Sequence, residues 1–288
     1  MNVRTYNPSV RVGNWNEDIQ LEEDTLKDFL ERKQKGQLLI QQSHSLGATL
    51  LQKRDLSVSR DGCVHFGDVV MLTCQEAADR TKYSSGVNPR DQCALAASST
   101  DISGTRNLEP VLRSVFVIKS VDGSADGQPL SYGQAFHLST VDEAGNLLLH
   151  SDQVSFRKSA KKSRHQVVSL VSEASYLTQW QVKCRDPRVR MEFEGAPVPA
   201  NEQVIITHCK TNQNLAVEQA FLLRTTMGQE YEISCNTYLN SHKAEEDVNK
   251  WVFKLSMPGN DFYPVAKETS NATSESSPPT SANAVQND

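Results

Sequence analysis

An all-β barrel built from three similar units is the fold that the sequence predicts, and three observations predict it. A short pattern of a turn followed by a strand occurs three times, at 67–72, 133–138 and 201–206. Each copy is followed, at a nearly constant distance, by an aromatic residue: Phe116, Trp180 or Trp251. No helical pattern stands out between the first and last of these markers. Units that repeat about every 67 residues, each with several short strands, are typical of a closed barrel with three-fold pseudo-symmetry, which is a β-trefoil.

The spacing within each unit supports this prediction. The distances between the strand position and the aromatic are 46, 44 and 47 residues for the pairs Val70 and Phe116, Phe136 and Trp180, and Val204 and Trp251. The three rings are expected to fill the barrel core, each stabilising the fold by about 2 to 3 kcal/mol. A role in stacking on sugars is the alternative for the rings. A small β-sandwich is the alternative fold, but it gives no reason for the period.

Short runs of aliphatic and β-branched residues between the markers predict the remaining strands. They are Cys93–Ala97, Asn146–His150, Gln166–Val171, Gln203–Cys209 and Tyr231–Cys235. The trefoil is therefore expected over 56–256, with units of about 56–121, 122–188 and 189–256. Residues 1–55 are expected to form an arm and an amphipathic helix, and 257–288 a disordered tail rich in Ser, Thr, Asn and Pro. The polar stretch 76–90 is expected to be a long surface loop.

Composition limits the classes of function. The chain has 288 residues and a formal net charge of −5, with a pI near 5.8, so no general affinity for nucleic acid is expected. The first residues lack the apolar core of a signal peptide, and no eighteen apolar residues run together, so neither secretion nor a membrane span is expected. Six cysteines in such a chain are expected to be reduced thiols in the cytosol.

The N-terminal region carries the clearest helical pattern, over residues 17–35. Its apolar stripe consists of Ile19, Leu26, Phe29 and Leu30. Asn16 is the expected N-cap and Gly36 the expected C-cap. An extended arm over 8–16, which includes Arg11 and Trp15, is expected before the helix. Two hypotheses stay open: Trp15 and the stripe pack on the barrel, or they anchor the arm to a partner.

Motifs for catalysis or metal binding are missing from the sequence, so no enzyme activity, metal or other cofactor is expected. His208 and Cys209 are neighbours, but in a strand their side chains point to opposite faces and cannot share a proton.

One segment departs from the even charge distribution. Nine basic residues and two acidic ones occur between Arg157 and Arg190. If folding brings their two halves together, they form a patch that can meet an acidic protein surface, RNA or a phosphoinositide. Otherwise they belong to two solvated loops. The candidate partner-binding residues are Arg11, Trp15, Lys158, Lys161, Lys162, Arg164, Arg185 and Arg188.

Several segments resemble the cilia- and flagella-associated protein 161 family. They are Arg11–Asp18, Leu21–Glu23, Lys27–Leu30, Gly36–Gln41, His65–Leu72, Tyr132–Gln134, Phe193–Ala200 and His208–Asn212. The resemblance implies a β-trefoil of the MIR type and a place among the microtubule inner proteins, which line the lumen of ciliary doublet microtubules. It supplies no catalytic residue.

The expectation that follows is a structural protein of the axoneme of cilia and flagella. The resemblance implies that α/β-tubulin and other microtubule inner proteins are its partners, that many copies lie along the axoneme, and that the protein supports ciliary motility. Neither nucleic acid nor membrane is an expected partner. The alternative is a cytosolic trefoil module that binds a carbohydrate or a phosphorylated ligand.

Overall fold

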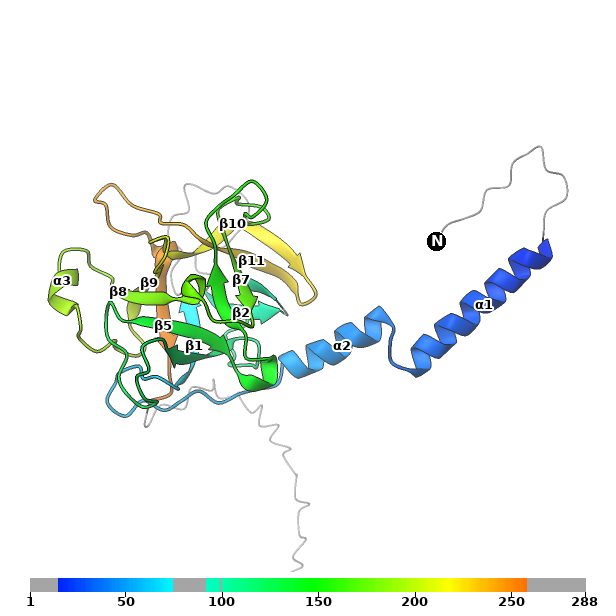
Figure 1. Cartoon of the computed structure of the whole chain (residues 1–288), viewed down its shortest axis with the longest axis horizontal. Helices are drawn as coiled ribbons and strands as arrows, with labels where there is room; N and C mark the ends of the chain where they lie inside the picture. Colours follow the sequence, from blue (N-terminus) through cyan, green and yellow to red (C-terminus); the bar gives the residue numbers. More distant parts are fainter. Residues whose placement is uncertain (1–14, 75–91, 99, 258–288) are drawn as a thin grey trace, which may run out of the picture.

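The computed structural model describes residues 15–74, 92–98 and 100–257. A β-barrel makes up most of the described chain, and two N-terminal helices extend from one side of it (Figure 1). The expected loop at 76–90, the tail from 258 and the arm up to residue 14 lie outside the described residues.

Each third of the barrel contributes four strands. The first unit has β1 (Val69–Cys74), β2 (Cys93–Ser98), β3 (Asp101–Thr105) and β4 (Val115–Ser120). The second has β5 (Ala135–Thr140), β6 (Leu148–Ser151), β7 (Gln166–Val171) and β8 (Trp180–Cys184). The third has β9 (Gln203–His208), β10 (Leu215–Thr225), β11 (Gly228–Cys235) and β12 (Lys250–Lys254). The five strand runs expected from the sequence fall on β2, β6, β7, β9 and β11, with β6 beginning two residues later and β11 three residues earlier than expected.

The strand pairing closes the barrel and identifies the fold as a β-trefoil. The first and fourth strands of the units pair in a ring, β1–β4–β5–β8–β9–β12 and back to β1. The second and third strands form three hairpins, β2–β3, β6–β7 and β10–β11, which pair with one another through β3, β7 and β11. A six-stranded barrel capped by three mutually paired hairpins leaves the ring without an open edge.

The three repeated aromatics lie at equivalent positions, as predicted. The register pairs Phe116 with Val70 and Trp180 with Phe136, and it pairs Trp251 with Val204. All three rings are fully buried. They fill the barrel interior, so they are not available to stack on a sugar.

Three backbone segments seal the end of the barrel opposite the hairpins. The N–H of Val64 donates to the oxygen of Val198, that of Leu130 to Val64, and that of Val198 to Leu130, at 2.8–3.0 Å. This closed cycle of hydrogen bonds satisfies backbone groups that would otherwise be buried without partners, since all three residues are fully buried. The barrel is therefore sealed at this end.

The repeated turns also match in detail. The backbone N–H groups of Gly67, Gly133 and Asn201 donate to the fourth strand of their own unit at 2.8–2.9 Å. Their φ angles are 86°, 79° and 61°, a region that only Gly and, to a lesser extent, Asn adopt readily. The recurrence of Gly or Asn at these positions therefore has a conformational cause.

The N-terminal region contains two helices, where the sequence analysis expected one. Helix α1 is Trp15–Gln34 and α2 is Leu39–Leu50. The expected start was wrong by two residues, because Trp15 and Asn16 belong to the helix and Asn16 is not its cap. Gly36 ends α1 with a φ of 69° and Gln37 N–H donates to Arg32 O, so the expected C-cap is confirmed.

The end of α2 fixes the helical arm to the barrel. The N–H of Arg113 donates to Leu50 O at 3.1 Å, and Leu112 N–H donates to Gln52 O at 2.8 Å. Helix α1 lies beyond α2, away from the barrel (Figure 1). Its apolar stripe does not pack on the barrel, because the four stripe residues keep 43–58% of their surface exposed. The first of the two hypotheses for this stripe is therefore wrong.

Candidate functional site

The loop between β6 and β7 is the main break in the symmetry of the three hairpins. It comprises residues 152–165 and is named the basic loop here; β2 and β3 are separated by residues 99–100, and β10 and β11 by residues 226–227. Between Phe156 and Arg164 the basic loop has five basic residues and no acidic one. Four predicted partner-binding residues lie in it: Lys158, Lys161, Lys162 and Arg164.

Buried carboxylates of the third unit hold the basic loop. The backbone N–H groups of Lys162 and Ser163 donate to the two carboxylate oxygens of Glu232, at 2.8 and 2.6 Å. His165 contacts Glu218 with 2.7 Å between Nδ1 and Oε1. Both glutamates are buried, and charge-assisted hydrogen bonds of this kind are stronger than neutral ones. The loop therefore has a defined shape.

Side-chain contacts fix part of the positive charge of the loop in place. Lys161 pairs with Asp101 at 2.7 Å, and Lys162 Nζ donates to Leu222 O at 2.6 Å. Lys158 pairs with Asp152 at 2.8 Å, and this hydrogen bond raises the pKa of Lys158. Within the described part of the chain, no ion pair is found for Arg157 or Arg164.

An apolar side chain accompanies these cations. Phe156 is completely exposed and Val154 is 49% exposed. Single exposed apolar residues are common, but here a phenylalanine stands beside Arg157 on a loop that buried carboxylates hold in place. Such a combination of ring and cations suits an acidic partner that also presents apolar groups.

The second half of the basic segment lies elsewhere on the barrel. Arg185 and Arg188 are exposed, and they lie between β8 and the short helix α3 (Arg190–Phe193). Arg185 donates to Gln203 Oε1 at 3.1 Å, whereas Arg190 is half-buried and pairs with Glu245 at 2.6 Å. The two halves contact different strands and form separate surfaces: the basic loop contacts β3, β10 and β11, and Arg185 contacts β9.

The helical arm provides the third candidate surface. Arg11 lies outside the described residues, and Trp15 is the first residue of α1. Salt bridges along α1 join Lys27 to Glu23 and Arg32 to Asp28, while the apolar stripe stays exposed. An amphipathic helix with an exposed apolar stripe is a frequent element of protein interfaces.

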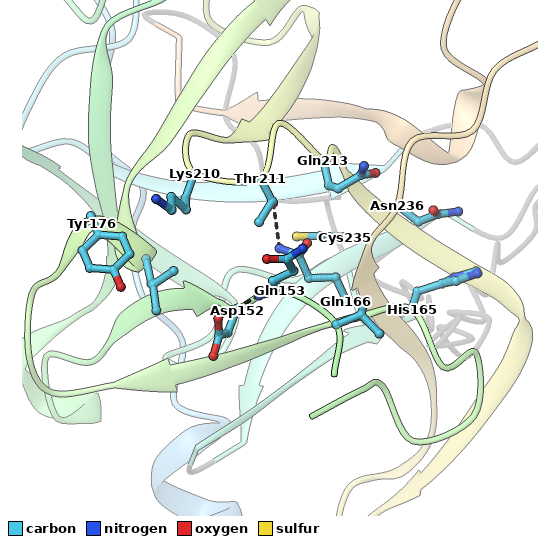
Figure 2. A pocket seen from close by; sticks show the side chains of 12 residues that line it. Asp152, Gln153, His165, Gln166, Tyr176, Lys210, Thr211, Gln213, Cys235 and Asn236 are labelled. Atoms are coloured by element: carbon cyan, nitrogen blue, oxygen red, sulfur yellow. Dashed lines mark hydrogen bonds between the residues drawn. The ribbon is translucent and has the colours of Figure 1, made fainter. Parts of the chain in front are cut away.

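A polar pocket of about 660 Å³ adjoins the basic loop and is the candidate site for the alternative function, binding of a carbohydrate or phosphorylated ligand (Figure 2). Lys210 is the one Lys or Arg among its lining residues, and its Nζ lies 5.2 Å from the ring centroid of Tyr176. Gln166 donates to Ser151 and Thr211, at 2.7 and 2.9 Å. The Gln166 amide thus already has partners within the protein, and a single cation is weak support for a phosphate site.

The neighbouring residues His208 and Cys209 do not form a catalytic pair. His208 is buried, with Nδ1 2.9 Å from Thr211 Oγ1 and Nε2 3.1 Å from Leu177 O, and burial lowers its pKa. Across the described ranges, no three His, Cys, Asp or Glu side chains are grouped as metal ligands. None of the helices in the described segments has the length and hydropathy needed to cross a membrane.

Comparisons with known proteins identify relatives along most of the chain. Residues 42–256 match the model of a cilia- and flagella-associated protein 161-like domain. The chain is 44% identical to cilia- and flagella-associated protein 161 of Danio rerio over 272 residues, which is 90% of each chain. It is 40% identical to the Bos taurus protein of the same name over 277 residues, covering 89% of this chain and 84% of the relative.

Among solved structures, similarity is weaker. The SDF2-like protein from Arabidopsis thaliana matches with a TM-score of 0.47 and 14% identity, over 68% of this chain and 98% of that one. The assignment to the β-trefoil class rests on the strand pairing described above.

Proposed function

The chain belongs to the cilia- and flagella-associated protein 161 family, and from this membership we propose that it is a structural microtubule inner protein of the axoneme. In this role it binds tubulin and neighbouring inner proteins in the lumen of the doublet and supports ciliary motility. The observation that carries the proposal is the combination of a sealed barrel with a helical arm whose apolar stripe is exposed. These features provide surfaces for partners, and many such contacts on a repeating lattice hold a protein through avidity.

The exposed cations beside α3 are the proposed contact with tubulin, an acidic protein. Arg185 and Arg188 are both exposed, and Met191 in α3 is 92% exposed. Arg190 ties this segment to the barrel through its pair with Glu245, so the two arginines are presented from a fixed position. An interface between opposite charges on exposed side chains depends on ionic strength.

Localisation and cosedimentation test the proposal. The tagged protein is expected in the axoneme and retained after detergent extraction, and purified protein is expected to sediment with doublet microtubules. Arg185→Glu with Arg188→Glu should weaken sedimentation, and raising the salt should weaken that of the unmodified protein. Lys53→Glu with Arg60→Glu makes the same charge change at other exposed positions and should have little effect. A diffuse protein that does not sediment would refute the proposal.

The alternative function, a cytosolic module for a carbohydrate or phosphorylated ligand, predicts a different result. The purified chain would then bind a glycan array or inositol phosphates through the pocket at Tyr176 and Lys210. Binding that is lost in Lys210→Ala, together with a diffuse location, would favour this alternative.

A further inference from the structure

The charges of α1 and of the basic loop complement each other. Between Glu17 and Asp24, α1 has five acidic residues and no basic one, and between Phe156 and Arg164 the loop has five basic residues and no acidic one. Both segments also present exposed apolar side chains. Opposite charge combined with apolar groups on both sides is the pattern of a protein interface.

The acidic residues of α1 frame its apolar stripe. Glu22 follows Ile19 by three residues and precedes Leu26 by four, so it lies on the same helical face. Glu23 follows Ile19 by four residues and lies at the other edge of the stripe. A partner that covers the stripe must therefore also accommodate these carboxylates, which favours a surface with cations beside an apolar group.

The basic loop offers such a surface in a fixed conformation. Glu232 and Glu218 hold its backbone and His165, and Phe156 is completely exposed. Arg157 and Arg164, which both follow Phe156 in the sequence, are exposed as well. Because the loop is held by buried groups, a partner helix meets it without a large ordering cost.

Helix α1 does not contact the basic loop of its own molecule in the structure. The base of the arm is fixed where Arg113 N–H donates to Leu50 O, and α1 points away from the barrel (Figure 1). A helix of 20 residues is about 30 Å long, so the acidic half of α1 is carried well beyond the barrel of its own chain. A second copy can be reached there.

We propose that α1 of one copy binds the basic loop of the next copy, with the apolar stripe against Phe156 and with Glu22 and Glu23 against Arg157 and Arg164. The two contacting surfaces differ, so the interface is head-to-tail, and a pair of molecules keeps one free arm and one free loop for further copies. Such an interface generates an open chain of copies. This inference is independent of how the protein contacts tubulin.

Charge-reversed full-length variants test the proposal by analytical ultracentrifugation over a concentration series. The unmodified protein should self-associate, and this association should weaken as NaCl rises from about 0.05 M to about 0.5 M. Arg157→Glu with Arg164→Glu should weaken it about tenfold, and Glu22→Lys with Glu23→Lys should do the same. The matched control, Asp24→Lys with Asp28→Lys, places the same charge change away from the stripe and should change it much less.

Mixing the two variants gives the decisive measurement. Each variant alone juxtaposes like charges, but in the mixture the basic arm of one variant meets the acidic loop of the other, and the unmodified arm meets the unmodified loop. Association should therefore return in the equimolar mixture. Phe29→Ser should weaken association without lowering the melting temperature of the barrel, since Phe29 is 46% exposed and does not pack on it.

Four results would overturn the proposal. The first is a monomer at every concentration and salt, and the second is failure of the mixture to associate. The third is association that responds to the α1 variants and not to the loop variants, which would indicate pairing of α1 with α1. The fourth is loss of cosedimentation with microtubules in Arg157→Glu with Arg164→Glu while self-association is unchanged, which would make tubulin the partner of the loop.

Discussion

Replacing Trp180 and Trp251 separately by phenylalanine tests how the repeated aromatics stabilise the barrel. Phenylalanine already occupies the third equivalent position, as Phe116, so the fold accepts this ring there. Both indoles are fully buried, and replacement by alanine is expected to cost about 3 to 5 kcal/mol, close to the whole stability of a domain. Phenylalanine removes less volume than alanine does, and it also removes the indole N–H. Because the change of volume is the same at both positions, the difference between the two variants reflects the hydrogen bonds.

The two positions differ in whether the carbonyl that accepts the indole hydrogen bond has a second donor. Trp180 Nε1 donates to Leu149 O at 2.9 Å, and Trp251 Nε1 donates to Leu215 O at 2.9 Å. Leu215 O also accepts from Asn249 Nδ2 at 3.1 Å. Opposite Leu149, the N–H of Leu170 donates to Thr100 O and not to Leu149 O.

Trp180→Phe is therefore expected to leave the buried carbonyl of Leu149 without a hydrogen-bond donor. In Trp251→Phe, Asn249 still donates to the carbonyl of Leu215. An unpaired buried acceptor costs about 1 to 3 kcal/mol, so Trp180→Phe should destabilise the protein by about 1 to 2 kcal/mol more than Trp251→Phe. For a domain of this size, the difference corresponds to a melting temperature lower by about 2 to 8 °C. Urea unfolding followed by circular dichroism measures both variants. Equal losses, or a larger loss in Trp251→Phe, would refute the reasoning.

Three further predictions concern the turns, a buried ion pair and the thiols. Gly133→Asn should destabilise the protein less than Gly133→Ala, because Asn201 already adopts a φ of 61° at the equivalent turn. A Cβ at this position would collide with the carboxylate of Glu194, so Glu194 must move in both variants and the difference between them reflects the φ preference; thermal unfolding that ranks alanine above asparagine would contradict this. Arg113→Met should cost about 3 to 5 kcal/mol at neutral pH, because it leaves the buried Glu230 carboxylate without its bidentate partner. Burial alone would raise the pKa of Glu230, but the hydrogen bonds from Arg113 hold this pKa below its usual value of 4.5. The contribution of the ion pair to stability is therefore present above about pH 4.5 and is lost as the pH falls through the folded-state pKa. The difference in unfolding free energy between the unmodified protein and Arg113→Met should become smaller in acid, and a difference that stays constant would contradict this role of the pair. Burial raises the pKa of the Cys235 thiol to about 12, so alkylation followed by mass spectrometry should modify it only on unfolding.

The barrel could be predicted from the sequence because each of the three units needs the same residue types at the same spacing. A turn with positive φ recurs at Gly67, Gly133 and Asn201, and a large ring recurs at a fixed distance from it. The pattern of turn and ring in each unit supports the assignment of the other two units. A strand pattern that occurred once would have no such support. The register that pairs Trp180 with Phe136 and Trp251 with Val204 follows the spacing in the sequence.

Helix α2 was missed because its local sequence gives little sign of a helix. Leu38 precedes it without a side-chain cap, and its first and last turns lack the charges that favour helix ends. Contact with the barrel compensates at its C-terminal end, where Arg113 N–H donates to Leu50 O. Such tertiary stabilisation cannot be read from the segment alone.

The basic loop lies where the hairpins of the three units differ, and this explains what the sequence could predict about it. Charge counts predict a basic segment here, because residues 156–164 contain five basic residues and no acidic one. The groups that hold the loop, Glu218 and Glu232, belong to another unit and are 53 and 70 residues from their partners in the sequence. Only the folded barrel brings them together. A trefoil can lengthen one hairpin in this way because the core aromatics and the sealed end do not depend on that hairpin's loop, so a partner surface can be added to the second unit while the barrel stays the same.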